Sequence, residues 1–373
     1  MKIKKILIVN QLYYPDGGGS EIFTKMLSED LNKSYEVFVL TINSSSSSIK
    51  KEKIDGINVI RIPTRNLYWV GDKHTHTSFE KIKWHLNQVF SNKQFEVIKK
   101  EIDMLEPDII IAQQIDGIGT NLYKLANQYR IIQTLHDSNI LNPTKTKFVN
   151  YFLSPVNKKR SKKIKEVTGV SSFINDTYRE SGFFPNAKFS IIENEIIATC
   201  LTDKKTKSRN KRLKVGFVGQ LVSQKGIKVF LEAINMCENI IDSVTVIGKD
   251  TEGLAKKMDN KINYLGALPI PEVYKEMSNF DVLVVPSIYS EPFGRVVIEA
   301  YRQRTIVITS NNGALPEINI DKDLILESVE PLSIVDKINR VYSNEYSLER
   351  YEKYSYKFSS NIEKFIKVIE SEG

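Results

Sequence analysis

Two glutamates at an expected strand-to-helix junction are the residues whose spacing says most about chemistry. Glu291 and Glu299 lie in EPFGRVVIEAYRQ (291–303), and Pro292 occupies a position suited to a first helical turn. Residues eight apart on a helix lie on nearly the same side, so both carboxylates can face one ligand. Carboxylates accept hydrogen bonds from hydroxyls, and the free N–H groups of 293–296 suit an anion. This arrangement fits a sugar nucleotide, which has hydroxyls at both ends and phosphate in the middle.

A glycine- and lysine-containing loop supplies a second candidate ligand set. GQLVSQKG (219–226) comes directly after an apolar run that predicts a strand. Gly219 permits a tight turn at the end of that strand. Lys225 can place a positive charge at a diphosphate, and Gly226 allows close backbone approach before the next helix. Ligands of α/β proteins bind at the carboxyl ends of strands, where this loop is expected.

Two further segments follow expected strands in the N-terminal half. YYPDGGGSE (13–21) contains three glycines that open a helix and could wrap a phosphate or an acceptor, although the segment is not a G-x-G-x-x-G dinucleotide fingerprint. TLHDSN (134–139) puts His136 and Asp137 at the end of a strand. A histidine there can serve the reaction or simply hold a turn. The three glycines are Gly17, Gly18 and Gly19.

The elements that must position these residues alternate between short apolar runs and helical patterns. Such alternation predicts an α/β fold with parallel sheets and helices on both faces. Expected helices cover 20–31, 119–128, 226–236 and 291–303, and 65–80 reads as a long loop. Expected strands cover 5–10, 36–41, 58–63, 108–112 and 130–136, and then 214–219, 243–248, 281–287 and 305–310.

The alternation is interrupted once, which divides the chain into two similar halves. We expect a first Rossmann-like domain over 1–198, a polar and basic linker over 199–212, and a second Rossmann-like domain over 213–355. A C-terminal helix within 356–373 is expected to pack back on the first domain.

Composition describes an ordinary globular protein with room for two domains. The chain has 373 residues, of which 41% are hydrophobic and 26% charged. Cys200 and Cys237 match no metal-ligand spacing and indicate free thiols in a reducing compartment. No apolar run approaches the roughly 18 residues that span a bilayer, and the N-terminus reads as a buried strand rather than a signal peptide. We therefore expect a cytoplasmic protein.

The formal net charge of +8 leaves several anionic partners open. The basic runs KKRSKKIK (158–165) and KKTKSRNKRLK (204–214) can be solvated faces, or they can attract anionic lipid and place the protein at the inner face of a membrane. A nucleic-acid-binding protein is a rival interpretation, but the chain has no aromatic–basic RNA motif or recognition-helix signature.

Taken together and in order, these motifs resemble the retaining glycosyltransferases of family four, which have the GT-B fold of two Rossmann-like domains facing across a cleft. EPFGRVVIE is similar to the E-x7-E motif of that family, and GQLVSQKG to its G-R-L-x-x-x-K-G loop. SNNGALPEI (310–318) resembles a donor-domain segment, and VTGVSSF (167–173) with IIENEI (191–196) the end of the first domain. The resemblance covers nearly the whole chain.

The resemblance implies a role for each motif residue. The first domain would bind the acceptor and the second the nucleotide sugar. Gln220 stands where the family usually has arginine, so charge neutralisation would depend on Lys225, the helix end and Arg295. The implied catalytic residues are His136 beside the sugar, Glu291 on sugar hydroxyls and Lys225 on the diphosphate. The implied donor-binding residues also include Glu299 on the ribose, the amides of Phe293 and Gly294 on the sugar, those of Val296 and Val297 on the phosphates, and Gly17, Gly18, Gly19 and Gly219.

The implied activity is that of a bacterial hexosyltransferase. It would move a sugar from a nucleoside diphosphate, UDP by expectation, to a hydroxyl acceptor with retention of configuration. Neither a cofactor nor a metal is implied, because no DxD-type carboxylate cluster accompanies the donor loop. The product would belong to a surface polysaccharide, glycolipid or glycoprotein. A sugar-nucleotide epimerase of the same fold remains an alternative, and an NAD dehydrogenase lacks its fingerprint.

Overall fold

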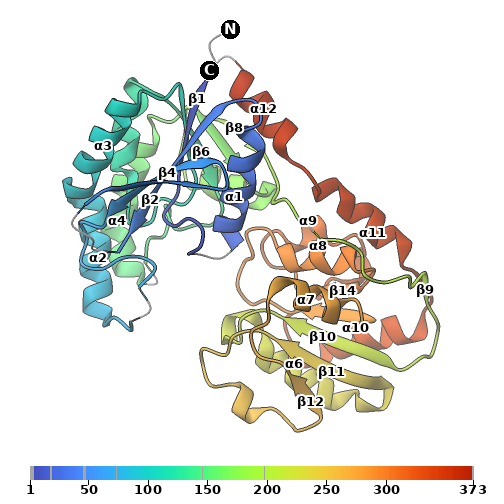
Figure 1. Ribbon diagram of the computed structural model, residues 1–373. Helices are drawn as coiled ribbons and strands as arrows, with labels where there is room; N and C mark the ends of the chain where they lie inside the picture. The colour runs from blue at the N-terminus through green and yellow to red at the C-terminus, as the bar shows by residue number, and fades with distance from the viewer. Residues whose placement is uncertain are drawn as a thin grey trace. The chain divides into compact units, whose positions relative to one another are not determined.

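The computed structural model describes residues 4–16, 19–44, 48–72, 74–144, 146–196 and 198–371. The chain forms two compact units, and each has its own largely parallel sheet (Figure 1). The first unit comprises Met1–Glu193 together with Asn361–Gly373, and the second comprises Asn194–Ser360. The predicted α/β class with two Rossmann-like domains is confirmed.

Eight strands form the sheet of the first unit, in the order β3-β4-β2-β1-β5-β6-β7-β8. All neighbouring strands run parallel except β3, which pairs antiparallel with β4. In β1 (Lys5–Val9) the four residues after Lys5 are fully buried, and continuous apolar runs of this kind are typical of parallel strands covered on both faces. The other strands are β2 (Glu36–Asn43), β3 (Lys50–Ile54), β4 (Ile57–Pro63), β5 (Ile109–Ala112), β6 (Arg130–Leu135), β7 (Glu166–Gly169) and β8 (Lys188–Ile191).

Helices cover both faces of this sheet. α1 (Gly19–Leu31) and α12 (Ile362–Glu370) lie on one face, while α2 (Ser78–Phe90), α3 (Lys93–Leu105) and α4 (Lys147–Ser161) lie on the other (Figure 1). α2 begins with a capping box, in which the Thr77 hydroxyl accepts from the Glu80 N–H and the Glu80 carboxylate accepts from the Thr77 N–H. The remaining elements are the 3₁₀ helix η1 (Thr120–Asn127) and α5 (Ser172–Glu180).

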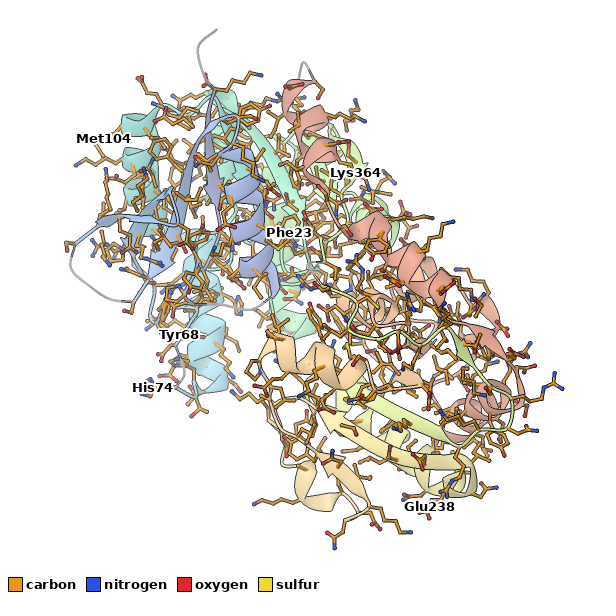
Figure 2. All side chains as sticks on the ribbon, turned by 45° about the vertical axis from the view of Figure 1, so that its right-hand side comes forward. Phe23, Tyr68, His74, Met104, Glu238 and Lys364 are labelled. Carbon is orange, nitrogen blue, oxygen red and sulfur yellow. The ribbon has the colours of Figure 1, made fainter. Side chains whose placement is uncertain are left out.

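The last helix of the chain completes the core of the first unit. Phe365 and Ile369 of α12 are buried in one cluster with Phe23 of α1 and the inner residues of β1, β2 and β5 (Figure 2). Arg130 at the start of β6 donates to two carbonyls in the last turn of α12, at 2.6 Å each, and pairs with Glu166 at 2.6 Å. A cation at the carboxyl end of a helix satisfies carbonyls that have no intrahelical donor.

Five strands form the second unit's main sheet, all parallel, in the order β12-β11-β10-β13-β14. A short antiparallel pair, β9 and β15, lies outside it. The strands are β9 (Thr206–Lys207), β10 (Leu213–Val218), β11 (Ile241–Ile247), β12 (Ile262–Tyr264), β13 (Val282–Val285), β14 (Ile306–Thr309) and β15 (Tyr346–Ser347). The helices are α6 (Ile227–Met236), α7 (Ile270–Met277), α8 (Arg295–Arg302), α9 (Leu315–Ile318), α10 (Pro331–Ser343) and α11 (Glu349–Ser355), with the 3₁₀ helices η2 (Ser223–Lys225), η3 (Glu238–Ile240), η4 (Ala255–Lys257), η5 (Lys322–Leu324) and η6 (Tyr356–Phe358).

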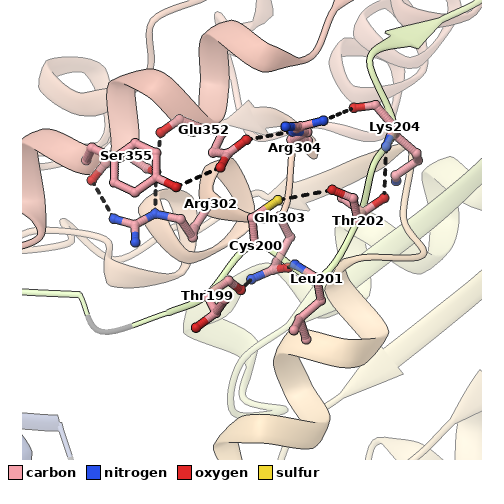
Figure 3. Close-up of polar contacts among 11 residues, drawn as sticks. Thr199, Cys200, Leu201, Thr202, Lys204, Arg302, Gln303, Arg304, Glu352 and Ser355 are labelled. Atoms are coloured by element: carbon pink, nitrogen blue, oxygen red, sulfur yellow. Dashed lines mark hydrogen bonds and ion pairs between the residues drawn. The ribbon is translucent and has the colours of Figure 1, made fainter.

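The expected linker is fixed to the second unit rather than free. Gln303 donates to the Thr199 carbonyl at 2.7 Å and accepts from the Leu201 N–H at 2.9 Å, and Arg304 donates to the Lys204 carbonyl at 3.0 Å (Figure 3). The buried Lys207 ammonium caps the carboxyl end of α10 by donating to the carbonyls of its last residues and of Asn344. Burial lowers the pKa of Lys207 to about 8.

The division between the units also differs from the expected boundaries at 198/199 and 355/356. The Ile196 N–H donates to the Phe358 carbonyl at 2.8 Å, and Arg302 donates to the Ala198 carbonyl at 2.6 Å and to Ser355. These bonds hold Ile196, Ala198 and residues 355–358 on the second unit, and the chain returns to the first unit at Asn361.

Two expected elements take a different form. The helix expected over 119–128 is the 3₁₀ helix η1, and the helix expected to begin around Pro292 begins at Arg295. Residues 65–72 and 74–77 are irregular, and α2 begins at Ser78. Over the described ranges, no helix combines the length and apolarity needed to span a bilayer.

Replacing Phe365 tests whether α12 stabilises the first unit. Phe365→Ala should reduce the free energy of unfolding of this unit by about 3–5 kcal/mol, because it removes a buried aromatic ring and leaves a cavity. Both tryptophans of the chain, Trp69 and Trp84, belong to the first unit, so urea unfolding followed by tryptophan fluorescence reports on it. Lys367→Ala on the exposed side of α12 is the control. Equal midpoints for the two variants would contradict the assigned role of α12.

Candidate functional site

The loop after β10 places Lys225 at the end of a short 3₁₀ turn. Gly226 follows with φ of +76°, and a Cβ there would lie 1.9 Å from the Pro286 carbonyl oxygen. Only glycine fits this close approach, which brings the loop against the end of β13. The Ile288 N–H donates to the Gln224 carbonyl at 2.9 Å and fixes the same contact from the other side.

Lys225 and Glu291, which are 66 residues apart in sequence, form an ion pair in the second unit. The Lys225 Nζ lies 2.5 Å from the Glu291 Oε1, and the Ser287 hydroxyl donates to the same oxygen at 2.6 Å. The Glu291 side chain is 11% exposed and that of Lys225 is 32% exposed. The lysine can therefore still reach a ligand from solvent, while the carboxylate is held in one position.

The segment after β14 holds the Glu291 backbone. Glu291 forms a parallel bridge with Gly313, and the Ala314 N–H donates to the Glu291 carbonyl at 2.8 Å. Gly313 has φ of +67°, and a Cβ there would lie 2.3 Å from the Glu291 carbonyl oxygen. Asn312 donates to the Ser287 carbonyl at 2.8 Å. The SNNG segment thus acts as a support for the carboxylate.

The helix that follows Glu291 starts later than its sequence indicates. Gly294, with φ of +91°, is the N-cap of α8, so Pro292 precedes the helix instead of occupying its first turn. The first amides of a helix lie outside its hydrogen-bond ladder, and in α8 these are the amides that follow Gly294. The Val297 N–H donates to the Gly294 carbonyl at 3.0 Å. Phe293 is buried and packs edge-on against Phe358 at 5.8 Å.

Glu299 makes contacts that are separate from those of Glu291. Its Oε1 lies 3.4 Å from both the Tyr274 hydroxyl and the Arg295 guanidinium. Burial, followed by the Glu299 charge, raises the pKa of Tyr274, which therefore stays a hydrogen-bond donor. Gln220 is exposed at the beginning of the loop. No described contact joins Glu291 directly to Glu299, so each carboxylate has its own partners.

The first unit has its own polar group at the carboxyl ends of β5 and β6. The His136 Nε2 lies 2.5 Å from the Gln113 Oε1, and the imidazole packs edge-on against Phe23 at 5.1 Å. The Gln113 side chain is buried, and its Nε2 has no hydrogen-bond partner in the part of the chain that the structure describes. His136 and Gln113 border a pocket of about 20 Å³, which has room for one water molecule or one hydroxyl group.

Two carboxyl groups line the same pocket. Asn139 donates to Asp116 at 2.9 Å, while Gln114 donates to Asp137 at 2.7 Å. Burial raises the pKa of Asp116. Burial and then repulsion from Asp116 raise the pKa of Asp137 to about 7, so the pair retains a proton near neutral pH.

The remaining residues predicted to bind the donor are four glycines. Gly219 ends the β10 segment, with its N–H bonded to the Ile247 carbonyl at 2.9 Å. Gly17 and Gly18 lie outside the described residues, and Gly19 is the first residue of α1.

Several residues of both sites escaped sequence analysis. Ser287 is the last residue of the DVLVVPS run, and Gln113 and Gln114 directly follow the β5 strand. Polar side chains immediately after a buried strand are the signal that could have identified them. Asp116 has no such signal, because it lies in the irregular segment before η1.

Comparison with known proteins gives relatives for both units. The chain is 28% identical to an uncharacterized 42.6 kDa protein in the cps region of Klebsiella pneumoniae, over 93% of this chain and 98% of that protein. It is also 28% identical to the O-antigen biosynthesis glycosyltransferase WclY of Escherichia coli, over 45% of this chain and 50% of that protein. The solved structure of Anabaena HepE in complex with UDP and glucose shares the fold, with a TM-score of 0.67 at 17% identity, over 99% of this chain and 100% of that one.

Two protein families match different halves of the chain. The family described as glycosyl transferase 4-like matches residues 12–170 in the first unit. The family described as glycosyl transferases group 1 matches residues 201–358, which contain the Lys225–Glu291 ion pair. The two matches place the chain in the GT-B glycosyltransferase superfamily, as a glycosyltransferase of group 1 type.

Proposed function

We propose that the chain transfers a hexose from a UDP-sugar to a hydroxyl acceptor with retention of anomeric configuration, in the synthesis of a cell-surface polysaccharide. The observation that carries this proposal is the Lys225–Glu291 pair beside the first turn of α8. A UDP donor is supported by HepE, whose structure contains UDP and glucose. A polysaccharide product is supported by the relatives from a cps region and from O-antigen biosynthesis.

In the proposed reaction, the donor diphosphate lies between Lys225 and the amides that begin α8. The bond between the anomeric carbon and the β-phosphate oxygen breaks, and the phosphate leaves with the electron pair. Lys225 and the helix dipole stabilise the charge that develops on it. The acceptor hydroxyl attacks from the same face and forms the glycosidic bond, and its proton passes to the departing phosphate. In this proposal no metal is needed, since Lys225, Arg295 and the helix end supply the positive charge.

Glu291 would orient the donor sugar by accepting hydrogen bonds from its hydroxyls. Its carboxylate already accepts from Lys225 and Ser287 through one oxygen, Oε1. Glu299 would bind the ribose. When a diphosphate binds, Lys225 gains a second anionic partner and shares its three N–H donors between the ligand and Glu291.

The pocket of the first unit would bind a hydroxyl group beside His136. The buried Gln113 amide supplies a donor that has no described partner, and Asp116 and Asp137 supply acceptors. A volume of about 20 Å³ admits one hydroxyl but not a sugar ring. His136 would act at the transferred sugar, as its family resemblance implies.

Nucleotide binding tests the proposed donor and the role of Lys225. UDP should raise the melting temperature more than GDP or ADP does. The three nucleotides differ only in the base, and the proposed donor carries uracil. Lys225→Ala should weaken UDP binding by about 10- to 100-fold in calorimetry, since it removes a charge-assisted hydrogen bond. Lys228→Ala, an exposed lysine on α6, is the matched control. Undiminished UDP binding by Lys225→Ala would reject the assigned diphosphate site.

Glu291→Gln separates the sugar contact from the diphosphate contact. UDP binding should be unchanged or stronger, because Lys225 loses a competing carboxylate, whereas the extra affinity for UDP-glucose over UDP should fall by about tenfold. Calorimetry with both ligands measures the difference. Equal losses for UDP and UDP-glucose would contradict a sugar-binding role. Conversion of the donor sugar without any acceptor would instead indicate an epimerase.

The Asp116–Asp137 pair should make the free energy of unfolding depend on pH. Asp137 ionises near pH 7 when folded and near its ordinary 3.8 when unfolded, so the fold loses stability as pH rises between these values. Asp116→Asn removes the repelling charge and should make that loss smaller. Urea unfolding at pH 5 and pH 8, followed by tryptophan fluorescence, measures it, with Asp242→Asn in the second unit as control. An unchanged difference between the two pH values would contradict the coupling.

A further inference from the structure

Helix α4 exposes three aromatic side chains on one face. Phe148, Tyr151 and Phe152 are 73%, 75% and 52% exposed. Their rings contact one another edge-on, with centroids 5.3 Å apart for Phe148 and Phe152 and 5.4 Å apart for Tyr151 and Phe152. The opposite side of the helix is buried through Val149 and Leu153. The helix therefore has a second apolar face that the fold of its own unit does not use.

Helix α2 also exposes aromatic side chains. It packs against α4 through Val89, which joins the cluster of Val149 and Leu153 (Figure 1). Its own exposed residues include Phe79 and Phe90, which are 75% and 56% exposed. Among the described residues, every exposed phenylalanine belongs to α2 or α4. Exposed apolar side chains are common singly, but a concentration of this kind indicates a surface that is covered in use.

The segment around α4 is also strongly basic. Residues 138–165 contain eight lysines and arginines and no aspartate or glutamate. Removing these eight from the 53 in the chain leaves 45, the same as the number of acidic residues. This one segment therefore carries a charge of +8, as large as the net charge of the whole chain. Lys159, Lys162 and Lys163 are exposed on the last turn of α4 and just beyond it.

We propose that α4 docks on an anionic membrane, with Phe148, Tyr151 and Phe152 inserted at the interface and Lys159, Lys162 and Lys163 on the lipid headgroups. These six residues are the aromatic–basic surface. An interfacial helix combines aromatic residues on one face with cations that attract anionic lipid. A second copy of this chain suits the surface poorly, because a symmetric dimer would bring two segments of +8 together.

The inner side of α4 borders the small pocket of the first unit. Asn157 lines this pocket and accepts from the Thr120 hydroxyl at 2.7 Å. A helix with its side chains is about 10 Å thick, so docking would hold the His136 pocket close to the lipid surface. The membrane proposal does not depend on the transfer reaction, since it rests on the outer face of the helix alone.

Vesicle flotation of the full chain tests this surface. The protein should bind vesicles of phosphatidylcholine with about 30% phosphatidylglycerol at least tenfold more strongly than phosphatidylcholine alone. The variant F148S/Y151S/F152S and the variant K159E/K162E/K163E should each lose at least about tenfold in binding to the anionic vesicles. M236S/L332S, which removes two exposed apolar side chains of the second unit, is the matched control and should bind like the unmodified chain.

Two measurements keep the outcome unambiguous. Urea unfolding followed by fluorescence of Trp69 and Trp84 should show a cooperative transition in all four proteins, which shows that the first unit of each is folded. UDP affinity should also be the same in all four, which separates this test from that of the donor site. Equal vesicle binding by the aromatic variant and the unmodified chain would overturn the proposal. Light scattering that shows a dimer converted to a monomer by F148S/Y151S/F152S, without vesicle binding by the unmodified chain, would overturn it in favour of an interface between copies.

Discussion

The Glu291 carboxylate, held between the Lys225 ammonium and the Ser287 hydroxyl, is the contact around which the second unit's site is organised. Its three participants follow two strands, β10 and β13, and Gly313 after β14 supports the glutamate backbone. Parallel strands end at one edge of a sheet, so residues far apart in sequence meet there. Because the ion pair is partly open to solvent, it contributes little stability, and its main effect is to orient the two groups.

The same constraint shapes the polar group of the first unit. Gln113 and Gln114 follow β5, and His136 and Asp137 follow the neighbouring strand β6. In both units, polar side chains thus meet at the ends of parallel strands, but the charges of these side chains differ. The second unit presents the Lys225–Glu291 ion pair, whereas the first presents amides, an imidazole and a pair of acids that retain a proton. A cation suits phosphate, while amides and carboxyls suit hydroxyls.

The sequence predicts the structure where a local pattern decides it. The buried strands, and the positions of the EPFG and QKG motifs after the ends of strands, followed from apolar runs. The sequence does not predict the structure where tertiary contacts decide it. The start of α8 depends on the left-handed Gly294, and the basic segment after Cys200 is fixed by hydrogen bonds to Gln303 and Arg304. The Asp116–Asp137 pair joins residues that no periodicity links.

The first unit is formed by segments that precede and follow the second unit, and this has a consequence for synthesis. The surface of α1 that carries Phe23 is covered by Phe365 and Ile369, which leave the ribosome after the whole second unit. Until then the nascent first unit exposes part of its core, and the second unit must emerge, and can fold, before the first is closed. The first unit therefore stays open during synthesis of the second, and its uncovered α1 surface is exposed to chaperones over that interval.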